Sequence, residues 1–410
     1  MNKVAIVVQR CHETIVGGSE SLAWQYATLL GDSYEVDVLT TAALDTSDWA
    51  NALPEGAAKK DNVNVLRFRV TSGRSAYWGQ LHQRLISGCS PFSPGRRRGS
   101  EYPPQLQWTL PLQEEFILKQ GPHSEGLMQF IRQRWKDYRV MIFVTYLYPT
   151  TYFGLQQVPP GRALFAPTLH DERTAYLPAF KQSAERAREL IWLTEAEQRV
   201  GRRLWGQLPG RVVSMAIDTK RREPPTPSFP YLLYCGRVDP NKGCAQMFEY
   251  FIRFQRTFPT RLRLIITGKE DIRVPDHPDI EFRGFVSNEE KLSLMSGATV
   301  YLMPSPNESF SIVTLEAMAQ GTAILANGNS PVLTDHIKRS GAGRVYDNYN
   351  SFAAALTEML SERCDLAGMG TYGRDYVVSQ YHTERIRAAL IEAVESCSGP
   401  SQHRNSGLAC

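Results

Sequence analysis

The sequence lacks the features that mark several whole classes of protein. Its seven cysteines are odd in number and scattered, with no C-x-x-C pair and no histidine spaced for zinc, so neither a disulfide scaffold nor a zinc site is indicated. No 18 apolar residues occur in a row, as a membrane-spanning helix would need, and no block of five like charges points to nucleic acid. We therefore expect a soluble protein of a reducing compartment.

The composition of the sequence is ordinary, but its charged residues are unevenly distributed along the chain. Its 410 residues, 42% of them apolar and 21% charged, are enough for two hydrophobic cores and a cleft between them. The net charge is only +4, yet residues 67–139 hold twelve Lys or Arg against five Asp or Glu. That stretch includes Arg96, Arg97 and Arg98, and it is either a solvated loop or a site for an anionic partner.

Strands alternate with helices on both sides of one linker. Val4 to Val8 is a β-branched run typical of a buried parallel strand, and Gly17 and Gly18 precede the helix that follows. The loop at residues 9–18 is long and no G-x-G-x-x-G opens that helix, so NAD or flavin binding is not indicated. Because a second strand–helix series follows the proline-rich stretch 224–230, we predict an α/β fold with two doubly wound parallel sheets.

These patterns predict the domain boundaries as well. An insertion in the first domain mixes Pro, Gly, aromatic and Arg residues without periodicity, so we expect it to be irregular. The predicted parts are a first domain at 1–223 with the basic insertion at 70–125, a linker at 224–230, a second domain at 231–378, a last helix at 379–397 and a disordered tail at 398–410.

The strongest chemical signal is the stretch from Pro304 to Gly321, in which seven residues separate Glu308 from Glu316. At about 1.5 Å per helical residue the two carboxylates would lie on the order of 12 Å apart, comparable to a sugar with a diphosphate and part of a ribose. A helix N-terminus between them would offer free N–H groups to the diphosphate. The alternative is structural, with Ser305-x-x-Glu308 as a capping box and Glu316 on a helix surface.

A second signal follows the first strand of the second series. Arg237 and Lys242 are placed to neutralise a diphosphate, and Gly243 would let the backbone approach it closely. Surface ion pairs are the alternative explanation for both cations. His170, at the end of a strand in the first series, is by itself more often a structural residue.

Together these motifs resemble the donor site of the retaining GT-B glycosyltransferases, in particular glycosyltransferase family 4 (glycosyl transferases group 1). The resemblance is good over about residues 230–330 and absent for 70–125. It implies two Rossmann-like domains, with the nucleotide sugar held mainly by the second, the acceptor mainly by the first, and no required metal. It also implies that the helix at 379–397 returns to the first domain.

By motif position, the resemblance implies a role for each residue. Glu308 would hold the sugar hydroxyls and Glu316 the ribose, Arg237 and Lys242 would hold the diphosphate, and His170 would contact the sugar at the reacting centre. The implied catalytic residues are His170, Arg237, Lys242 and Glu308, with no metal ligand. The further donor-side residues are Gly17, Gly18, Phe285, Val286, Ser309, Phe310, Ser311 and Ile312, where Ser309 and Ser311 replace glycines of the family, and the acceptor-side residues are Glu20, Arg96, Arg97 and Arg98.

The resemblance thus implies a retaining, metal-independent hexosyltransferase. Its donor would be a UDP- or GDP-sugar, with no other cofactor, and its acceptor a hydroxyl of a glycan, glycolipid or lipid-linked molecule, anionic if the basic insertion binds it. Such an enzyme would act in cell-surface polysaccharide or glycoconjugate biosynthesis, in the cytoplasm or peripherally at the inner face of the membrane, and without nucleic acid. The alternatives are a non-catalytic nucleotide-sugar-binding protein and a GT-B relative such as a nucleotide-sugar epimerase.

Overall fold

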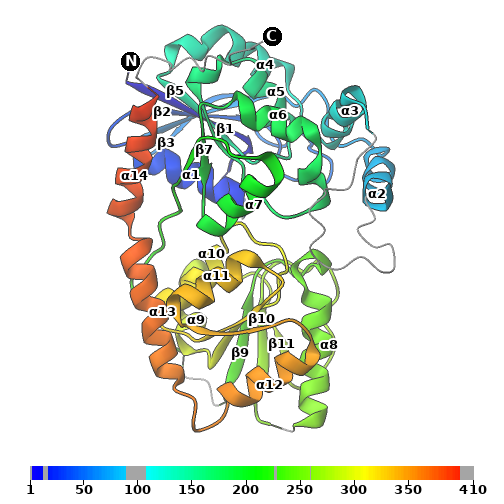
Figure 1. The fold of residues 1–410 in the computed structure, drawn as a ribbon, viewed down its shortest axis with the longest axis vertical. Helices are drawn as coiled ribbons and strands as arrows, with labels where there is room; N and C mark the ends of the chain where they lie inside the picture. Colours follow the sequence, from blue (N-terminus) through cyan, green and yellow to red (C-terminus); the bar gives the residue numbers. More distant parts are fainter. Residues whose placement is uncertain (1, 13–16, 89–107, 226–228, 259, 398–410) are drawn as a thin grey trace, which may run out of the picture. The chain divides into compact units, whose positions relative to one another are not determined.

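The protein consists of two compact α/β units, seen in a computed structural model that describes residues 2–12, 17–88, 108–225, 229–258 and 260–397 (Figure 1). Unit 1 comprises residues 1–213 and 387–410, and unit 2 comprises residues 214–386. The predicted tail at 398–410, residues 226–228 of the predicted linker and residues 89–107 of the insertion lie outside the described residues.

Unit 1 is built on an eight-stranded sheet in the order β3-β4-β2-β1-β5-β6-β7-β8. All neighbours are parallel except β3 and β4, which pair antiparallel. Val4 to Val8 are wholly buried within β1, which lies between β2 and β5, so the predicted central strand is confirmed. The strands are β1 Lys3–Arg10, β2 Glu35–Thr41, β3 Gly56–Lys60, β4 Val63–Phe68, β5 Val140–Val144, β6 Ala163–Ala166, β7 Glu189–Trp192 and β8 Gly210–Val212.

The insertion predicted to be irregular contains two helices, so that prediction was wrong in part. Helix α2 (Trp78–Gly88) buries Leu81 and Leu85, and α3 (Leu110–Gln120) buries Phe116 and Ile117. Each helix is only 11 residues long and buries only a few apolar residues among polar ones, too sparse a pattern to stand out in the sequence. The other helices of this part are α1 Gly18–Leu30, α4 Glu125–Arg134, α5 Pro149–Gln156, α6 Pro178–Arg186 and α7 Glu195–Trp205, with short 3-10 turns η1 Trp135–Asp137, η2 Pro160–Arg162 and η3 Arg173–Tyr176.

Unit 2 contains a six-stranded, wholly parallel sheet in the order β11-β10-β9-β12-β13-β14. The central strands are buried on both faces, as their continuous apolar runs predict. Its elements are β9 Tyr231–Cys235, η4 Pro240–Lys242, α8 Cys244–Thr257, β10 Arg263–Thr267, β11 Ile280–Phe282, α9 Asn288–Gly297, β12 Val300–Met303, α10 Ile312–Gln320, β13 Ile324–Asn327, α11 Pro331–Ser340, β14 Gly343–Tyr346, α12 Tyr349–Met359 and α13 Leu366–Gln380.

Both sheets reverse their strand order at one point. The chain runs outward from β1 in one direction and returns to β5 beside it, and in unit 2 it does the same at β9 and β12. Loops that leave the carboxyl ends of two such strands diverge and leave a crevice, where ligands of doubly wound sheets bind. The two sheets therefore place candidate sites after β1 and β5 and after β9 and β12.

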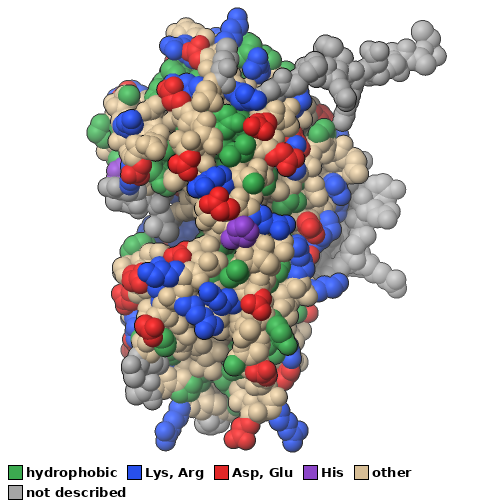
Figure 2. Space-filling model, turned by 90° about the vertical axis from the view of Figure 1, so that its left-hand side faces the viewer, with side chains coloured by type: hydrophobic (Ala, Val, Ile, Leu, Met, Phe, Trp, Pro, Cys, Tyr) green, Lys and Arg blue, Asp and Glu red, His purple; other side chains and the backbone are tan. Residues whose placement is uncertain are grey.

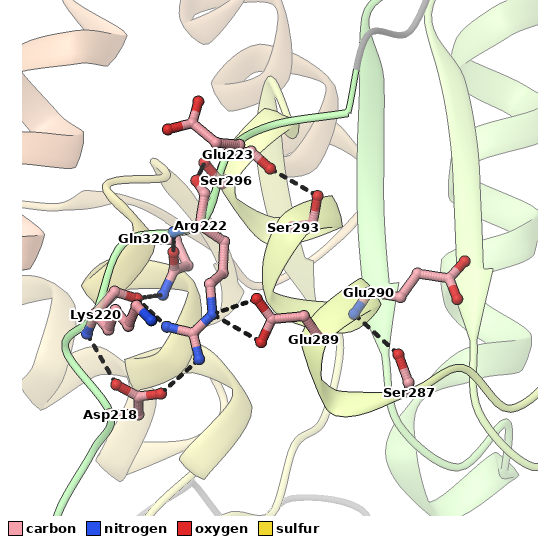
Figure 3. A network of polar contacts seen from close by, with 10 residues as sticks. All are labelled: Asp218, Lys220, Arg222, Glu223, Ser287, Glu289, Glu290, Ser293, Ser296 and Gln320. Carbon is pink, nitrogen blue, oxygen red and sulfur yellow. Dashed lines mark hydrogen bonds and ion pairs between the residues drawn. The ribbon is translucent and has the colours of Figure 1, made fainter.

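The boundary between the units falls before the proline-rich stretch, because the preceding segment is fastened to unit 2. Arg222 binds the carboxylates of Asp218 and Glu289, each at 2.9 Å, and its backbone N–H donates to Gln320 on α10 (Figure 3). Ser296 of α9 also donates to the Arg222 carbonyl oxygen. Residues 214–223, expected in the first domain, thus belong to unit 2.

Helix α13 contains a glycine pattern that could be mistaken for a dinucleotide-binding motif if only the sequence were considered. Gly368, Gly370 and Gly373 have the G-x-G-x-x-G spacing, but they lie inside a helix rather than in a loop after a strand. A Cβ at Gly370 would come within 1.9 Å of the Gly321 carbonyl oxygen. These glycines therefore permit close packing of α13 against α10 and do not indicate a dinucleotide site.

The last described residues return to unit 1. Helix α14 (Thr383–Ser396) buries Leu390, Ala393 and Val394 there, and Arg188 donates to the carbonyl oxygen of Ser396 at 2.6 Å. No helix in the described part of the chain is both long and apolar enough to cross a membrane. On the face drawn in Figure 2, Lys and Arg side chains are interspersed with Asp and Glu.

Candidate functional site

The candidate site of unit 2 is formed by the two loops that follow β9 and β12. The first loop ends in η4 and Gly243, which adopts a left-handed φ of 74°. A Cβ on Gly243 would come within 2.3 Å of the Pro304 carbonyl oxygen, so glycine permits the two loops to touch. The Asn327 side chain donates to the same carbonyl at 2.8 Å and supports the second loop from β13.

Lys242 and Glu308 join these loops directly. The Lys242 ammonium donates to Glu308 Oε1 at 2.7 Å, and the two side chains are 31% and 12% exposed. Arg237, which ends the turn after β9, is half exposed and lies 3.7 Å from Asp239 and 3.9 Å from Asp271. The structure thus brings the predicted cation and the predicted sugar-binding carboxylate together at the switch point of the sheet, with a second cation on the same loop.

The capping-box alternative for Glu308 does not hold. Helix α10 begins at Ile312 with Ser311 as its N-cap, so Glu308 lies in the loop before the helix. The Ser305 hydroxyl donates instead to the carbonyl of Asn307 at 3.1 Å. Ser309 and Ile312 are half-buried, Phe310 and Ser311 are buried, and the loop presents Glu308 beside Lys242.

Glu316 lies on α10, where the sequence expects it, and has a partner that the sequence did not suggest. Lys291 of α9 is 2.6 Å from Glu316 Oε2, and both side chains are mostly buried. Burial raises the pKa of Glu316, and the charge of Lys291 opposes that rise. The ammonium of Lys291 therefore holds Oε2 in place. A carboxylate oxygen can accept more than one hydrogen bond, so Glu316 can still accept from a ligand hydroxyl.

Ser311 is strained, and its hydroxyl offsets part of the strain. Its φ of 64° is left-handed, a conformation that costs a non-glycine residue about 1–2 kcal/mol, while its hydroxyl hydrogen-bonds Thr314 at 2.9 Å. Ser311→Ala keeps the strain and loses the bond, so we expect it to be about 1 kcal/mol less stable than wild type. Ser311→Gly relieves the strain and should stay within about 1 kcal/mol of wild type.

Native-state hydrogen exchange of peptides from α10 would measure both variants. The glycine variant is the control, because it removes the same hydroxyl. Equal protection of the two variants would show that the left-handed backbone of residue 311 stores no free energy.

In unit 1, the switch point carries the predicted glycines and Glu20. Gly17 is the N-cap of α1 and Gly18 its first residue, so their backbone N–H groups lie at the positive end of the helix dipole. Glu20 is buried, and its carboxylate accepts from Arg10 at 2.6 Å, Gln9 at 3.1 Å and Ser19 at 2.9 Å. These bonds favour a structural role for Glu20 over the predicted contact with an acceptor.

His170 is half-buried in a loop after β6 that is held in an unusual conformation. Thr145 and Thr168, at the ends of β5 and β6, have φ angles of 69° and 51°, and their hydroxyls lie 3.1 Å apart. β-branched residues rarely adopt such angles, and strain of this kind clusters at functional sites. Next to His170, the N–H of Leu169 donates to Glu197 Oε1 at 2.6 Å.

Glu197 is a buried residue of this loop system that the sequence did not single out. Its second oxygen accepts the Leu193 N–H at 2.6 Å, so one carboxyl group clamps the ends of β6 and β7. Burial raises the pKa of Glu197 to about 8, against the lowering effect of its backbone hydrogen bonds. Nothing in the sequence separates it from an ordinary acidic residue in the first turn of a helix.

The remaining predicted residues divide into two groups. Phe285 is 71% exposed and Val286 is half-buried, after Gly284 at a φ of 66°, so the phenyl ring is accessible to a ligand. Arg96, Arg97 and Arg98, the predicted acceptor-side cations, lie outside the described residues.

A pocket in unit 2 adjoins the candidate site without containing it. It measures about 580 Å³ and is formed by residues 270–277 with Ile280 and Phe282. Its lining holds three carboxylates, those of Glu270, Asp271 and Asp276, against the single cation of Arg273, so it is poorly suited to a diphosphate. Neither Lys242 nor Glu308 lines it. Among the described residues, no three His, Cys, Asp or Glu side chains are grouped as a metal site requires.

Known proteins share the sequence of this region. Residues 216–376 match the family described as glycosyl transferases group 1. The chain is 33% identical over 180 residues to the phosphatidyl-myo-inositol mannosyltransferase of Mycolicibacterium smegmatis, covering 41% of this chain and 45% of that protein. It is 30% identical over 182 residues to the GDP-mannose-dependent alpha-(1-6)-phosphatidylinositol monomannoside mannosyltransferase of Mycobacterium tuberculosis, covering 40% and 46%. The matches thus span less than half the length of these relatives.

Solved structures match the fold over almost the whole chain. The sucrose-phosphate synthase of Thermosynechococcus elongatus superposes with a TM-score of 0.67 at 17% identity, covering 97% of this chain and 99% of that one. HepE of Anabaena, in complex with UDP and glucose, gives a TM-score of 0.65 at 14% identity, covering 97% and 100%. The chain therefore has the two-sheet GT-B fold of these structures, and its residues 216–376 match the glycosyl transferases group 1 family.

Proposed function

We propose that the protein is a retaining glycosyltransferase that moves a hexose from a nucleotide diphosphate sugar to an acceptor hydroxyl without a required metal. The observation that carries the proposal is the contact between Lys242 and Glu308 at the switch point between β9 and β12. A sugar and a diphosphate are adjacent in such a donor, and they need a hydrogen-bond acceptor beside a cation.

The charges of the site suit a leaving diphosphate. Arg237 and Lys242 would stabilise the negative charge that develops on the diphosphate, and the N-terminus of α10 would add to this effect. Glu308, the proposed sugar-binding carboxylate, pairs with Lys242 and holds its ammonium in place. Glu316, which Lys291 holds at 2.6 Å, would accept a further hydrogen bond from the ribose.

The proposed reaction needs no enzyme nucleophile. The bond between the anomeric carbon and the diphosphate oxygen breaks, and the acceptor oxygen forms its bond to that carbon on the same face. The acceptor proton passes to the departing phosphate oxygen, which leaves His170 to position the sugar. Because water would compete for the anomeric carbon, the site must exclude it during transfer.

The relatives indicate where to look for substrates. Two of them carry out mannosyl transfer to phosphatidylinositol-based acceptors, and the name of one specifies GDP-mannose. We therefore propose GDP-mannose as the first donor to test and a lipid-linked or inositol-containing hydroxyl as the first acceptor. A basic first unit would favour an anionic acceptor, in keeping with a role in glycoconjugate synthesis.

The proposal is tested by incubating the protein with labelled UDP- and GDP-sugars, first alone and then with the acceptors. We expect one donor to raise the melting temperature and to be slowly hydrolysed. Glu308→Gln should lower turnover by about 10²–10³-fold, EDTA should have no effect, and the transferred sugar should keep its anomeric configuration. Binding without turnover under all conditions would identify a non-catalytic binding protein. Conversion of the donor to another free nucleotide sugar would identify an epimerase.

A further inference from the structure

A buried histidine of unit 2 contacts the backbone of the glutamate loop. His336, on α11, is 1% exposed, and both of its ring nitrogens have partners. Nε2 is 2.9 Å from the carbonyl oxygen of Phe310, and Nδ1 is 3.1 Å from the hydroxyl of Tyr376 on α13. Phe310 lies between Glu308 and Ser311, whose left-handed φ is strained. The imidazole therefore contacts the loop at the peptide that precedes the strained residue.

The partners of the ring determine where its proton lies. A carbonyl oxygen can only accept, so Nε2 carries the proton and Nδ1 accepts from Tyr376. The Tyr376 hydroxyl is in turn 2.9 Å from the hydroxyl of Tyr381, which can donate to it. Burial lowers the pKa of His336 to about 4, so the ring is neutral near pH 7 and can be both donor and acceptor.

The same residues pack the loop from the side. The Phe310 ring meets the His336 ring edge-on at 6.3 Å between centroids and the Tyr381 ring at 5.6 Å. The carbonyl of Tyr381 accepts the N–H of Ile217 at 2.9 Å, so the cluster also reaches the segment at which unit 2 begins. Phe310, His336, Tyr376 and Tyr381 are all buried, and water cannot readily replace a bond that is lost here.

We propose that His336 is a positioning residue: its Nε2–H fixes the Phe310 carbonyl and thereby sets Glu308 for the sugar of the donor. The inference rests on the proposed function of Glu308. His336 itself touches no part of the proposed donor and acts through the loop. Its effect should therefore fall on turnover more than on the affinity for a nucleoside diphosphate that lacks the sugar.

A matched pair of variants tests the inference in the full chain. His336→Gln places an amide nitrogen near the position of Nε2 and can still donate to Phe310. His336→Asn places it near Nδ1 and cannot reach that carbonyl. The two variants remove the same ring, so a difference between them reports the bond to the loop rather than the lost packing. The readouts are hydrogen exchange of peptides from residues 304–316, the Kd values of UDP and GDP, and turnover of the donor.

We expect His336→Gln to stay within about threefold of wild-type turnover and His336→Asn to lose about tenfold or more, with faster exchange of the loop and little change in the Kd values. Equal exchange and equal turnover of the two variants would overturn the inference. If neither variant folds, NMR of the wild-type protein labelled with ¹⁵N-histidine decides. A neutral His336 ring that carries its proton on Nε2 would support the inference. A proton on Nδ1 alone would overturn it, because Nε2 could not then donate to Phe310.

The outcome remains separable from the proposed function. A wild-type protein that turns over no nucleotide sugar would refute the transferase proposal, while the exchange difference between the Gln and Asn variants would still show whether His336 holds the loop. An active enzyme with indistinguishable Gln and Asn variants would refute this inference alone.

Discussion

Lys242→Ala should lower the turnover of the nucleotide sugar by about 10²–10³-fold, because it removes a preorganised charge at the point where the leaving diphosphate gains its own. Glu308→Gln should produce a loss of similar size, since the amide keeps the shape of the side chain but not its charge. The Lys242–Glu308 pair is partly exposed, and such pairs contribute only about 1 kcal/mol or less to stability. Both variants should therefore fold and melt much as wild type does.

A second lysine–glutamate pair supplies the control. Lys181 and Glu185 form an exposed i,i+4 pair at 3.3 Å on α6, and Lys181→Ala should change neither turnover nor stability. Single-turnover measurements with the enzyme in excess over the donor, at several enzyme concentrations, would separate a slower chemical step from weaker binding. Near-wild-type rates in both Lys242→Ala and Glu308→Gln would remove the basis of the site assignment.

Glu197→Ala should destabilise unit 1 by about 2–5 kcal/mol, because the buried N–H groups of Leu169 and Leu193 lose their acceptor at about 1–3 kcal/mol each. Glu197→Gln should cost less, since one oxygen remains while the amide nitrogen faces the other N–H. Exposed Glu195, in the same first turn, gives the control Glu195→Gln, which should stay within about 0.5 kcal/mol of wild type.

Tryptophan fluorescence during urea unfolding measures this effect selectively. All seven tryptophans, from Trp24 to Trp205, belong to unit 1, so the signal reports that unit. Equal midpoints for Glu197→Ala and Glu195→Gln would mean that the carboxyl clamp contributes nothing.

The same residue predicts a pH dependence of stability. The pKa of Glu197 is raised to about 8 in the folded state, above its value in the unfolded chain, so the folded state binds more protons between these pKa values. Its contribution is full below about pH 4 and is lost as the pH rises toward 8, a change on the order of 4 kcal/mol. The free energy of unfolding of wild type should fall relative to that of Glu197→Gln over this range. A constant difference would show that the carboxyl group is ionised throughout.

The sequence predicted the parts of this fold in which local pattern and burial agree. The run Val4 to Val8 could only suit a strand covered on both faces. Arg237, Lys242 and Glu308 lie in loops that follow such strands, and Glu316 lies in the helix after the second loop. Helices α2 and α3 were missed because each shows the core only a few apolar residues.

The residues that hold the site were harder to predict than the residues that form it. Glu197, Lys291 and His336 act through contacts with segments distant in the sequence, and their neighbours in the chain carry no motif. Thr145 and Thr168 adopt left-handed φ angles that threonine disfavours, so no local rule could predict this backbone conformation from the sequence.

The return of residues 387–397 to unit 1 has a consequence for the order in which the protein is made. A ribosome releases the chain from its N-terminus, so residues 1–213 emerge long before the segment that supplies Leu390, Ala393 and Val394 to their core. Asp32 and Arg188 can contact Arg387 and Ser396 only after all of unit 2 has been synthesised. Unit 2 is contiguous in the sequence and can fold while it emerges from the ribosome. Unit 1 therefore starts to form first but completes its fold last.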